Sequence, residues 1–220
     1  MKKVDVVTAL SSAVADVEKA LEMLRNAKNQ ISENGVPEVL TEERKPEDGI
    51  YLVYQNGHNI PFKDDLPKAL ASDVSGIGVV YDGHAFKVAL KDLGEQPLIK
   101  DENNTCPDES PFYKTECEGL HDWDFESATN HLKECGMDMP LPDGWYIPTL
   151  AVLEVMCFMK EKINKALEYA GGSPMPDDYH WSSTENHRSY ARIVNFYSGT
   201  SYTSYVKYNS LVVRPVTAFI

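Results

Sequence analysis

The feature that most constrains the fold is a β-hairpin signature in the first half of this 220-residue sequence. Two runs rich in strand-forming residues, 77–81 and 85–90, flank the dipeptide Asp82-Gly83. This dipeptide is typical of the tight primed turns that join two antiparallel strands. The sequence therefore predicts an antiparallel sheet.

Two segments in the second half of the chain carry helix signals. Asp124 is placed to cap a helix that continues to Cys135, and Gly136 is placed to end it. Thr149 is placed to cap a second, largely apolar helix, which we expect to continue to Gly171.

Short extended runs separated by turns make up most of the remaining sequence. A run at 50–54 ends in an Asn-Gly turn, and four more runs follow residue 180. Residues 95–120 are polar and contain three prolines, which predicts a long surface excursion. Two helices among many short strands predict an α+β fold.

Residues 4–33 carry apolar side chains at alternating spacings of three and four. This heptad repeat, with Lys28 at one seam position, is typical of a coiled coil. The alternative is an amphipathic helix that packs on its own domain, although such a helix usually presents a wider apolar stripe. We expect an oligomerisation helix at 1–35, a charged linker at 36–49 and the main domain at 50–220. The pattern does not distinguish a dimer from a trimer.

The charge balance excludes some classes of partner. The chain has 34 acidic and 21 basic residues, a formal net charge of −13. Nucleic acids and anionic membrane surfaces are bound through clustered Lys and Arg, so we expect neither as a partner. No run approaches the roughly 20 apolar residues of a membrane-spanning helix. Without a recognisable signal peptide, we expect synthesis in the cytoplasm, with virion association or export by another route.

Motifs for catalysis and metal binding are absent from the sequence. It contains no HExxH or HxxxH pair, no GxSxG elbow and no CxxC pair. Cys157 lies in an apolar run and is expected to be a small buried side chain. A Cys106–Cys117 bridge is conceivable in an oxidising setting. We therefore expect no enzymatic activity, no cofactor and no metal.

Tyrosine and serine are concentrated near the C-terminal end. Five tyrosines fall within residues 190–208 and are interleaved with serines. Tyr202 and Tyr205 differ in parity, so both faces of a regular strand, or a loop, would have to hold tyrosine. Tyr and Thr also favour strands for packing reasons. The mixture nevertheless resembles an antibody paratope, in which Tyr supplies rigid contact area and Ser supplies adaptable hydrogen bonds. The composition favours an interaction surface.

Several landmarks within residues 76–220 together resemble one protein family. They are "DGHAFKVALKDLG", "LPDGWYIPT", "INKALEYAGG", "YHWSSTE", "ARIVNFYSG" and "VVRPVTAF". This set is similar to the variable proteins of diversity-generating retroelements, which include phage tropism determinants and relatives in gut bacteria and their prophages. The resemblance implies a C-type-lectin-like fold, which that family shares with the formylglycine-generating enzymes.

The resemblance also implies which positions vary. In this family, template adenines, mostly in AAC-type codons, are randomised during reverse transcription; the corresponding variable region here is about 181–214. The diversified, ligand-binding positions that it implies are Asn186, His187, Ser189, Tyr190, Ile193, Tyr197, Ser198, Thr200, Ser201, Tyr202, Ser204, Tyr205, Tyr208, Ser210 and Leu211. The fixed framework that it implies is Trp181, Glu185, Phe196, Gly199, Lys207, Arg214 and Pro215. Arg214 is expected to make a fixed ion pair or backbone contact.

The function implied is that of a receptor-like variable protein that binds a protein or cell-surface ligand, with the N-terminal helix forming a homo-oligomer. One alternative is a formylglycine-generating-type enzyme on the same scaffold, although the late active-site cysteines of those enzymes are absent. The other is a structural virion or fimbrial subunit. The calcium-and-sugar motifs of true C-type lectins do not occur around "HWSSTE", so calcium-dependent glycan binding is not expected.

Overall fold

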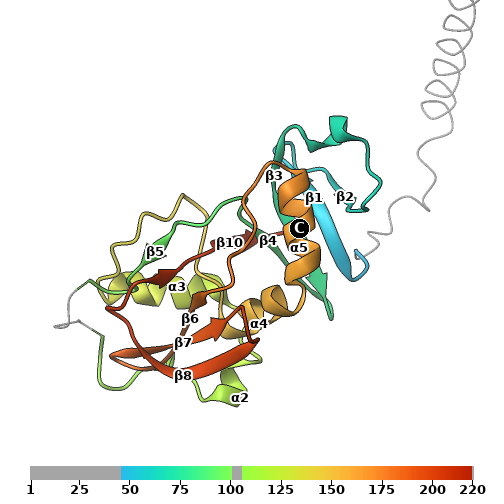
Figure 1. The fold of residues 1–220 in the computed structure, drawn as a ribbon. Coiled ribbons are helices and arrows are strands. Elements are labelled where there is room, and N and C mark those ends of the chain that lie inside the picture. The colour runs from blue at the N-terminus through green and yellow to red at the C-terminus, as the bar shows by residue number, and fades with distance from the viewer. Residues whose placement is uncertain (1–45, 101–105, 220) are drawn as a thin grey trace, which may run out of the picture. The chain divides into compact units, whose positions relative to one another are not determined.

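A computed structural model describes residues 46–100 and 106–219, and the body that it describes begins at Glu47. The predicted coiled coil and most of the predicted linker lie outside these residues. The elements, most of which are labelled in Figure 1, are β1 (Gly49–Tyr54), β2 (Asn59–Pro61), the 3₁₀ helix η2 (Lys68–Ala71), β3 (Val74–Tyr81), β4 (His84–Val88), β5 (Glu95–Gln96), α2 (Glu116–Gly119), α3 (Phe125–Glu134), α4 (Leu150–Phe158), α5 (Lys160–Tyr169), β6 (Tyr179–His187), β7 (Tyr190–Asn195), β8 (Thr200–Val206), β9 (Leu211–Val212) and β10 (Val216–Ala218).

The first sheet contains the predicted hairpin. Its strand order is β10-β4-β3-β1-β2, and all pairings in it are antiparallel. The β3–β4 turn places Asp82 at φ 49° and Gly83 at φ 78°. Two successive residues at positive φ define the primed turn that Asp-Gly favours, because Gly has no Cβ to clash and Asp tolerates this region. The hairpin prediction is confirmed.

The second sheet carries the C-terminal strands in the order β5-β9-β6-β7-β8. β6, β7 and β8 form an antiparallel meander, whereas β9 pairs with β6 in parallel. β8 is therefore an edge strand of this sheet. Two five-stranded sheets and four α-helices confirm the α+β class among the described residues.

The meander is covered by helices on both of its faces (Figure 1). Successive side chains of a strand point to opposite sides. Trp181 and Ile193 accordingly join a core with Leu132 of α3, while Val194 joins a second core with Met156 of α4. α5 packs this second core against β1 and β3 of the first sheet. The meander that carries the C-terminal hairpin is thus covered by a core on each of its two faces.

Helix capping follows the sequence at α3 and departs from it at α4. Asp124 accepts a hydrogen bond from the Ser127 N–H at 3.0 Å, as expected for an N-cap. At the next helix, Thr149 Oγ1 instead donates to the Asp122 carbonyl, and Thr184 Oγ1 of β6 accepts the Leu150 N–H. The first N–H group of α4 is therefore capped by a side chain from strand β6 and not by Thr149, the residue expected from the local sequence.

Two other expectations need correction. The single helix predicted from Thr149 to Gly171 is two helices, because α4 ends at Phe158 and α5 begins at Lys160. The 95–120 segment is not wholly a surface excursion, since Leu98, Ile99 and Cys106 are buried in the core beneath β9. In the described part of the chain, no helix has the length and apolarity needed to cross a membrane.

Candidate functional site

Exposed aromatic side chains are concentrated on the C-terminal hairpin. Seven large apolar or aromatic side chains are exposed among the described residues, and four of them are Tyr190, Tyr197, Tyr202 and Tyr208. Tyr197 is 81% exposed at the β7–β8 turn. We call the surface formed by β8, the β6–β7 and β7–β8 turns and Tyr208 the tyrosine face.

A β-bulge brings Tyr202 and Tyr205 to the same side of the sheet. Ala191 pairs with Tyr205 and Ile193 with Tyr202, so two steps along β7 match three along β8. Directly paired residues share a face of an antiparallel sheet. Both tyrosine rings contact Tyr179, with centroid separations of 5.7 Å for Tyr202 and 6.5 Å for Tyr205. The expectation that their parity separates them was wrong, because the extra β8 residue restores the phase.

The Tyr202 phenol is a neutral hydrogen-bonding group. A side-chain hydrogen bond with Tyr179 is the main reason that the pKa of Tyr202 is raised above its ordinary value. Because a phenol already titrates near pH 10, a higher pKa keeps the O–H proton in place at neutral pH. The tyrosine face therefore offers apolar ring area together with hydroxyl donors and acceptors, without added charge.

Most of the fifteen positions expected to vary lie where a ligand can reach them. Thirteen are exposed or half-buried, and the other two, Ile193 and Leu211, are buried. Ile193 is fully buried on β7 under Trp181, and Leu211 lies in the same core on β9. These two side chains therefore lie in the core and not on the tyrosine face. β7 is covered on both sides, so Arg192 and Val194, the strand neighbours of Ile193, are buried as well.

The β7–β8 turn is held by one fixed side chain. Asn195 Oδ1 accepts hydrogen bonds from the backbone N–H groups of Tyr197 and Ser198, at 2.9 and 3.4 Å. Gly199 follows at φ 70°, a conformation that favours glycine. The exposed Tyr197 side chain takes no part in these bonds. The turn can therefore keep its conformation while that side chain changes.

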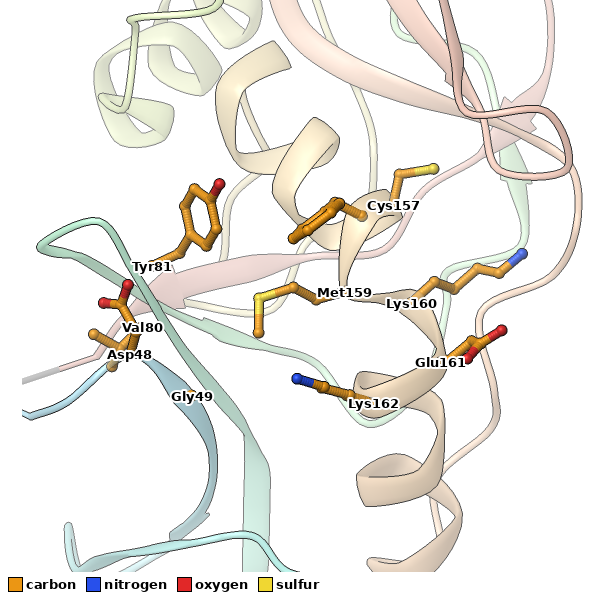
Figure 2. A pocket seen from close by; sticks show the side chains of 10 residues that line it. Asp48, Gly49, Val80, Tyr81, Cys157, Met159, Lys160, Glu161 and Lys162 are labelled. Atoms are coloured by element: carbon orange, nitrogen blue, oxygen red, sulfur yellow. The ribbon is translucent and has the colours of Figure 1, made fainter.

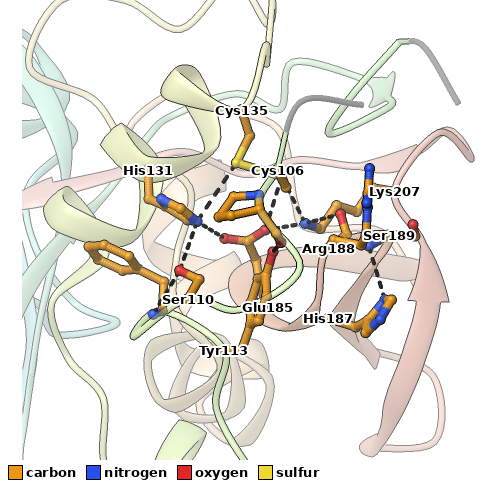
Figure 3. The surroundings of a disulfide bond; sticks show 12 residues. Cys106, Ser110, Tyr113, His131, Cys135, Glu185, His187, Arg188, Ser189 and Lys207 are labelled. Atoms are coloured by element: carbon orange, nitrogen blue, oxygen red, sulfur yellow. Dashed lines mark hydrogen bonds and ion pairs between the residues drawn. A yellow bond between two sulfur atoms is a disulfide. The ribbon is translucent and has the colours of Figure 1, made fainter. Parts of the chain in front are cut away.

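Beneath the tyrosine face lies a buried charged pair, Glu185 and Lys207, each with 1% of its side chain exposed (Figure 3). Lys207 Nζ contacts Glu185 Oε1 and also donates to the Arg188 carbonyl at 2.8 Å. Its own carbonyl accepts the Leu98 N–H at 2.8 Å. Burial raises the pKa of Glu185 and lowers that of Lys207, while their mutual attraction opposes both shifts. Lys207 thus ties the segment after β8 to the β6–β7 turn.

A second buried charge fixes the end of the domain. Arg214 is fully buried; its guanidinium pairs with Asp92 and donates to the carbonyls of Ala89 and Ser173 at 3.0 and 2.9 Å. The expected ion pair and backbone contacts of Arg214 are confirmed. Trp181, also buried, donates its indole N–H to the Gln96 carbonyl at 2.9 Å. The framework residues Trp181, Glu185, Phe196, Lys207, Arg214 and Pro215 are all buried, whereas Gly199 is an exposed turn residue.

The cysteine pairing differs from the one considered from the sequence. Cys106 forms a disulfide with Cys135 at the end of α3 (Figure 3). Cys117 is free and exposed on the short helix α2. Cys106 and Cys135 are buried in one core with Trp181 and Ile193, which brings them together. The Cys106–Cys117 pairing considered from the sequence was wrong. Closeness in sequence does not determine which cysteines enter the same core.

A pocket of about 510 Å³ lies between the β3–β4 hairpin and the α4–α5 junction (Figure 2). Its lining includes Tyr81, Cys157, Met159 and Lys160. Burial is the main reason that the pKa of the Cys157 thiol is raised. A raised pKa disfavours the thiolate that a cysteine nucleophile requires. Cys157 is half-buried rather than buried as expected, and the pocket supplies no activated thiol.

The sequence patterns gave no role in this region to three residues that the structure places there: Tyr179, Tyr113 and Cys135. Tyr179 organises the two β8 tyrosines, and Tyr113 lies with its ring 6.4 Å from that of His187. Strand alternation around Trp181 was a signal available for Tyr179, since the two share a face two residues apart. No local pattern marks Tyr113, which reaches the face from a distant loop.

Comparison with known proteins gives a single kind of evidence. No protein-family model matches the chain. No curated protein matches it either. Among solved structures, the chain is similar to a fimbrial protein from Bacteroides ovatus ATCC 8483, with a TM-score of 0.52 and 16% sequence identity over 78% of this chain. The match covers 48% of that protein, so the chain spans about half of its length. At this identity the likeness shows the fold alone.

Proposed function

We propose that this chain is a non-enzymatic binding protein that contacts a protein or cell-surface ligand through the tyrosine face. The observation that carries the proposal is the exposure of Tyr190, Tyr197, Tyr202 and Tyr208 on one hairpin above a buried frame. Tyrosine supplies large contact area with few side-chain torsions to immobilise, and the nearby serines supply hydrogen bonds. A cluster of exposed aromatic side chains on a protein surface commonly marks an interaction site.

We further propose that a retroelement diversifies this face on a C-type-lectin-like scaffold. The sequence landmarks support this, and so does the division of the region into thirteen accessible positions and a buried framework. A loop turn fixed by Asn195 and Gly199 tolerates exchange of the side chains around it. Oligomerisation through the 1–35 helix would raise weak single-site binding by avidity.

A second candidate is a structural fimbrial subunit, which the fold likeness to a fimbrial protein favours. The two candidates are compatible in location, since a binding module and a structural subunit can both belong to a surface appendage. They differ in whether the tyrosine face varies. The likeness supports a surface location and is silent on variation.

Sequencing the gene from many clonal descendants separates the two candidates. The binding proposal expects substitutions at adenine-bearing codons among the thirteen accessible positions, with Glu185, Lys207 and Arg214 unchanged. A nearby template repeat and reverse transcriptase gene are expected as well. Substitutions scattered along the gene, or a tyrosine face that never changes, would favour the fimbrial subunit and contradict the diversification.

A further inference from the structure

The disulfide lies in a cluster of side chains of the kinds that bind metals (Figure 3). One ligand atom each from Cys106, Cys135 and Glu185 lie within 4.8 Å of one another, and all three residues are buried. They come from the segment before α2, the end of α3 and β6, so that tertiary structure alone brings them together.

His131 supplies a fourth donor to this cluster. Its Nε2 atom lies 3.3 Å from Glu185 Oε2 and 3.7 Å from Cys135 Sγ. For the usual Zn–N, Zn–O and Zn–S bond lengths, neighbouring ligands of a tetrahedral zinc ion are separated by roughly 3.3–3.8 Å. The His131 ring stacks on Phe112 at 4.4 Å, and its Nε2 also lies 3.2 Å from Ser110 Oγ. Stacking holds the ring with Nε2 directed at the cluster.

One carboxylate oxygen in the cluster lacks a hydrogen-bond donor. Glu185 Oε1 contacts Lys207 Nζ, whereas Oε2 is buried and accepts no hydrogen bond. A buried acceptor without a partner costs free energy, and the great majority of such groups in proteins are satisfied. Oε2 lies 3.3 Å from His131 Nε2, and in the tautomer that carries its proton on Nδ1 this nitrogen presents a lone pair and donates nothing to Oε2. A cation between the two atoms would satisfy both.

We propose that the reduced form of this chain binds Zn²⁺ through Cys106, Cys135, His131 and Glu185. Two thiolates, an imidazole and a carboxylate are ligand types that zinc prefers in four-coordinate sites. The charges also balance: the dication and the Lys207 ammonium oppose two thiolates and one carboxylate. Lys207 Nζ lies 3.4 Å from Cys106 Sγ, where it is placed to donate to a metal-bound thiolate.

Disulfide and zinc are alternative links at the same place. A thiol reductant transfers two electrons and two protons to the Cys106–Cys135 bond, giving two thiols and oxidising the reductant to its own disulfide. Zinc binding then displaces the two thiol protons into solvent. The link between the segment before α2 and α3 would thus persist in reducing surroundings as a metal site and in oxidising surroundings as a disulfide. This inference does not depend on the proposed function.

The test uses Co²⁺ as a spectroscopic substitute for zinc in the full-length chain. A Cys117→Ser, Cys157→Ser double variant leaves only the two cysteines of the cluster. After reduction with a phosphine and its removal under argon, we expect one Co²⁺ per chain, with thiolate-to-cobalt absorption and the strong visible bands of tetrahedral cobalt. Stoichiometric Zn²⁺ should abolish both features. The oxidised double variant, which retains the disulfide, should bind no cobalt with this spectrum.

Two further variants in that background decide the result. Cys135→Ser should remove the thiolate band or halve its intensity, and His131→Gln should weaken Co²⁺ binding at least about tenfold, as even outer-shell changes do. Circular dichroism checks that each variant is folded. If Cys135→Ser does not fold, the titration of the parent and of His131→Gln still decides. Absence of the thiolate band in the reduced parent, or a band that is unchanged in a folded variant, would overturn the proposal.

Discussion

The tyrosine face alternates in sequence with the buried residues beneath it, which we call the base and which include Glu185, Lys207, Phe196 and His180. The two sets of residues lie in opposite environments. Tyr208 is 49% exposed, whereas the adjacent Lys207 is 1% exposed and contacts Glu185. Likewise Tyr197 is 81% exposed, whereas Phe196 is 2% exposed and packs on His180. In each pair the buried residue holds the backbone in place, and the exposed tyrosine determines the chemistry of the surface. The contrast teaches how a hairpin can change its contacts without changing its fold.

Removing one charge of the base is expected to have the largest effect. Glu185→Ala leaves the Lys207 ammonium buried without its partner, which typically costs about 3–5 kcal/mol of unfolding free energy. Urea denaturation measures the loss. The matched control is Asp64→Ala, which breaks the exposed Asp64–Lys165 pair and should cost less than about 1 kcal/mol. Equal losses in the two variants would show that the buried pair does not hold the base.

Removal of the disulfide comes next. Measured without reductant and without metal, Cys106→Ser should lower the unfolding free energy by ~3–4 kcal/mol. The reason is that Cys106 and Cys135 are 29 positions apart, so that their disulfide closes a long loop. Cys117→Ser, at an exposed free cysteine, should change it by less than about 0.5 kcal/mol. Chemical denaturation of both variants without reductant compares the two cysteines directly. A loss at Cys117 as large as that at Cys106 would contradict the pairing.

The base should also make stability depend on pH through His180. Burial lowers the pKa of this ring to about 4. A free histidine titrates near pH 6.5, so the unfolded chain binds the proton first as pH falls. The stabilisation is complete above about pH 6.5 and is lost as pH falls towards 4, by at most roughly 3 kcal/mol. His180→Phe keeps a ring against Phe196 and should reduce this slope; an unchanged slope between pH 6.5 and 4 would assign it to other groups.

The smallest effect is expected on the face itself. Tyr197→Ala should change the unfolding free energy by less than about 0.5 kcal/mol, because the side chain is exposed and the turn is held by Asn195. Phe196→Ala, one residue earlier, should cost about 3–5 kcal/mol through the cavity that it leaves. Thermal melts of the two variants test the contrast. Comparable losses at both positions would remove the distinction between face and base.

Local patterns in the sequence predicted the elements better than their tertiary partners. The Asp82-Gly83 turn and the Asp124 cap depend on neighbouring residues, and both are confirmed. The Cys106–Cys135 link depends on which segments share a core, and no spacing reveals it. The bulge in β8 was missed for a related reason, since it is defined by pairing with β7 rather than by β8 alone.

The fifteen variable positions were inferred from the codons that the resemblance implies, and codons carry no information about burial. That is why thirteen of them lie on the surface but Ile193 and Leu211 lie in the core. Lys207, which falls outside the codon set, and Arg214 are both buried and ion-paired, with Glu185 and Asp92 respectively. That they stay unchanged remains a prediction. The coiled coil at 4–33 stays a prediction, since it lies outside the described residues.

The separation of a changeable face from a fixed base can be measured with a library displayed on cells and selected for protease resistance. The library randomises each of the fifteen positions and the framework residues. We expect the thirteen accessible positions to accept most substitutions with little loss of resistance. Ile193, Leu211, Trp181, Glu185 and Lys207 should accept few, because each is buried in the base or its core. Equal tolerance at Tyr197 and Lys207, or equal intolerance, would contradict the separation of a changeable face from a fixed base.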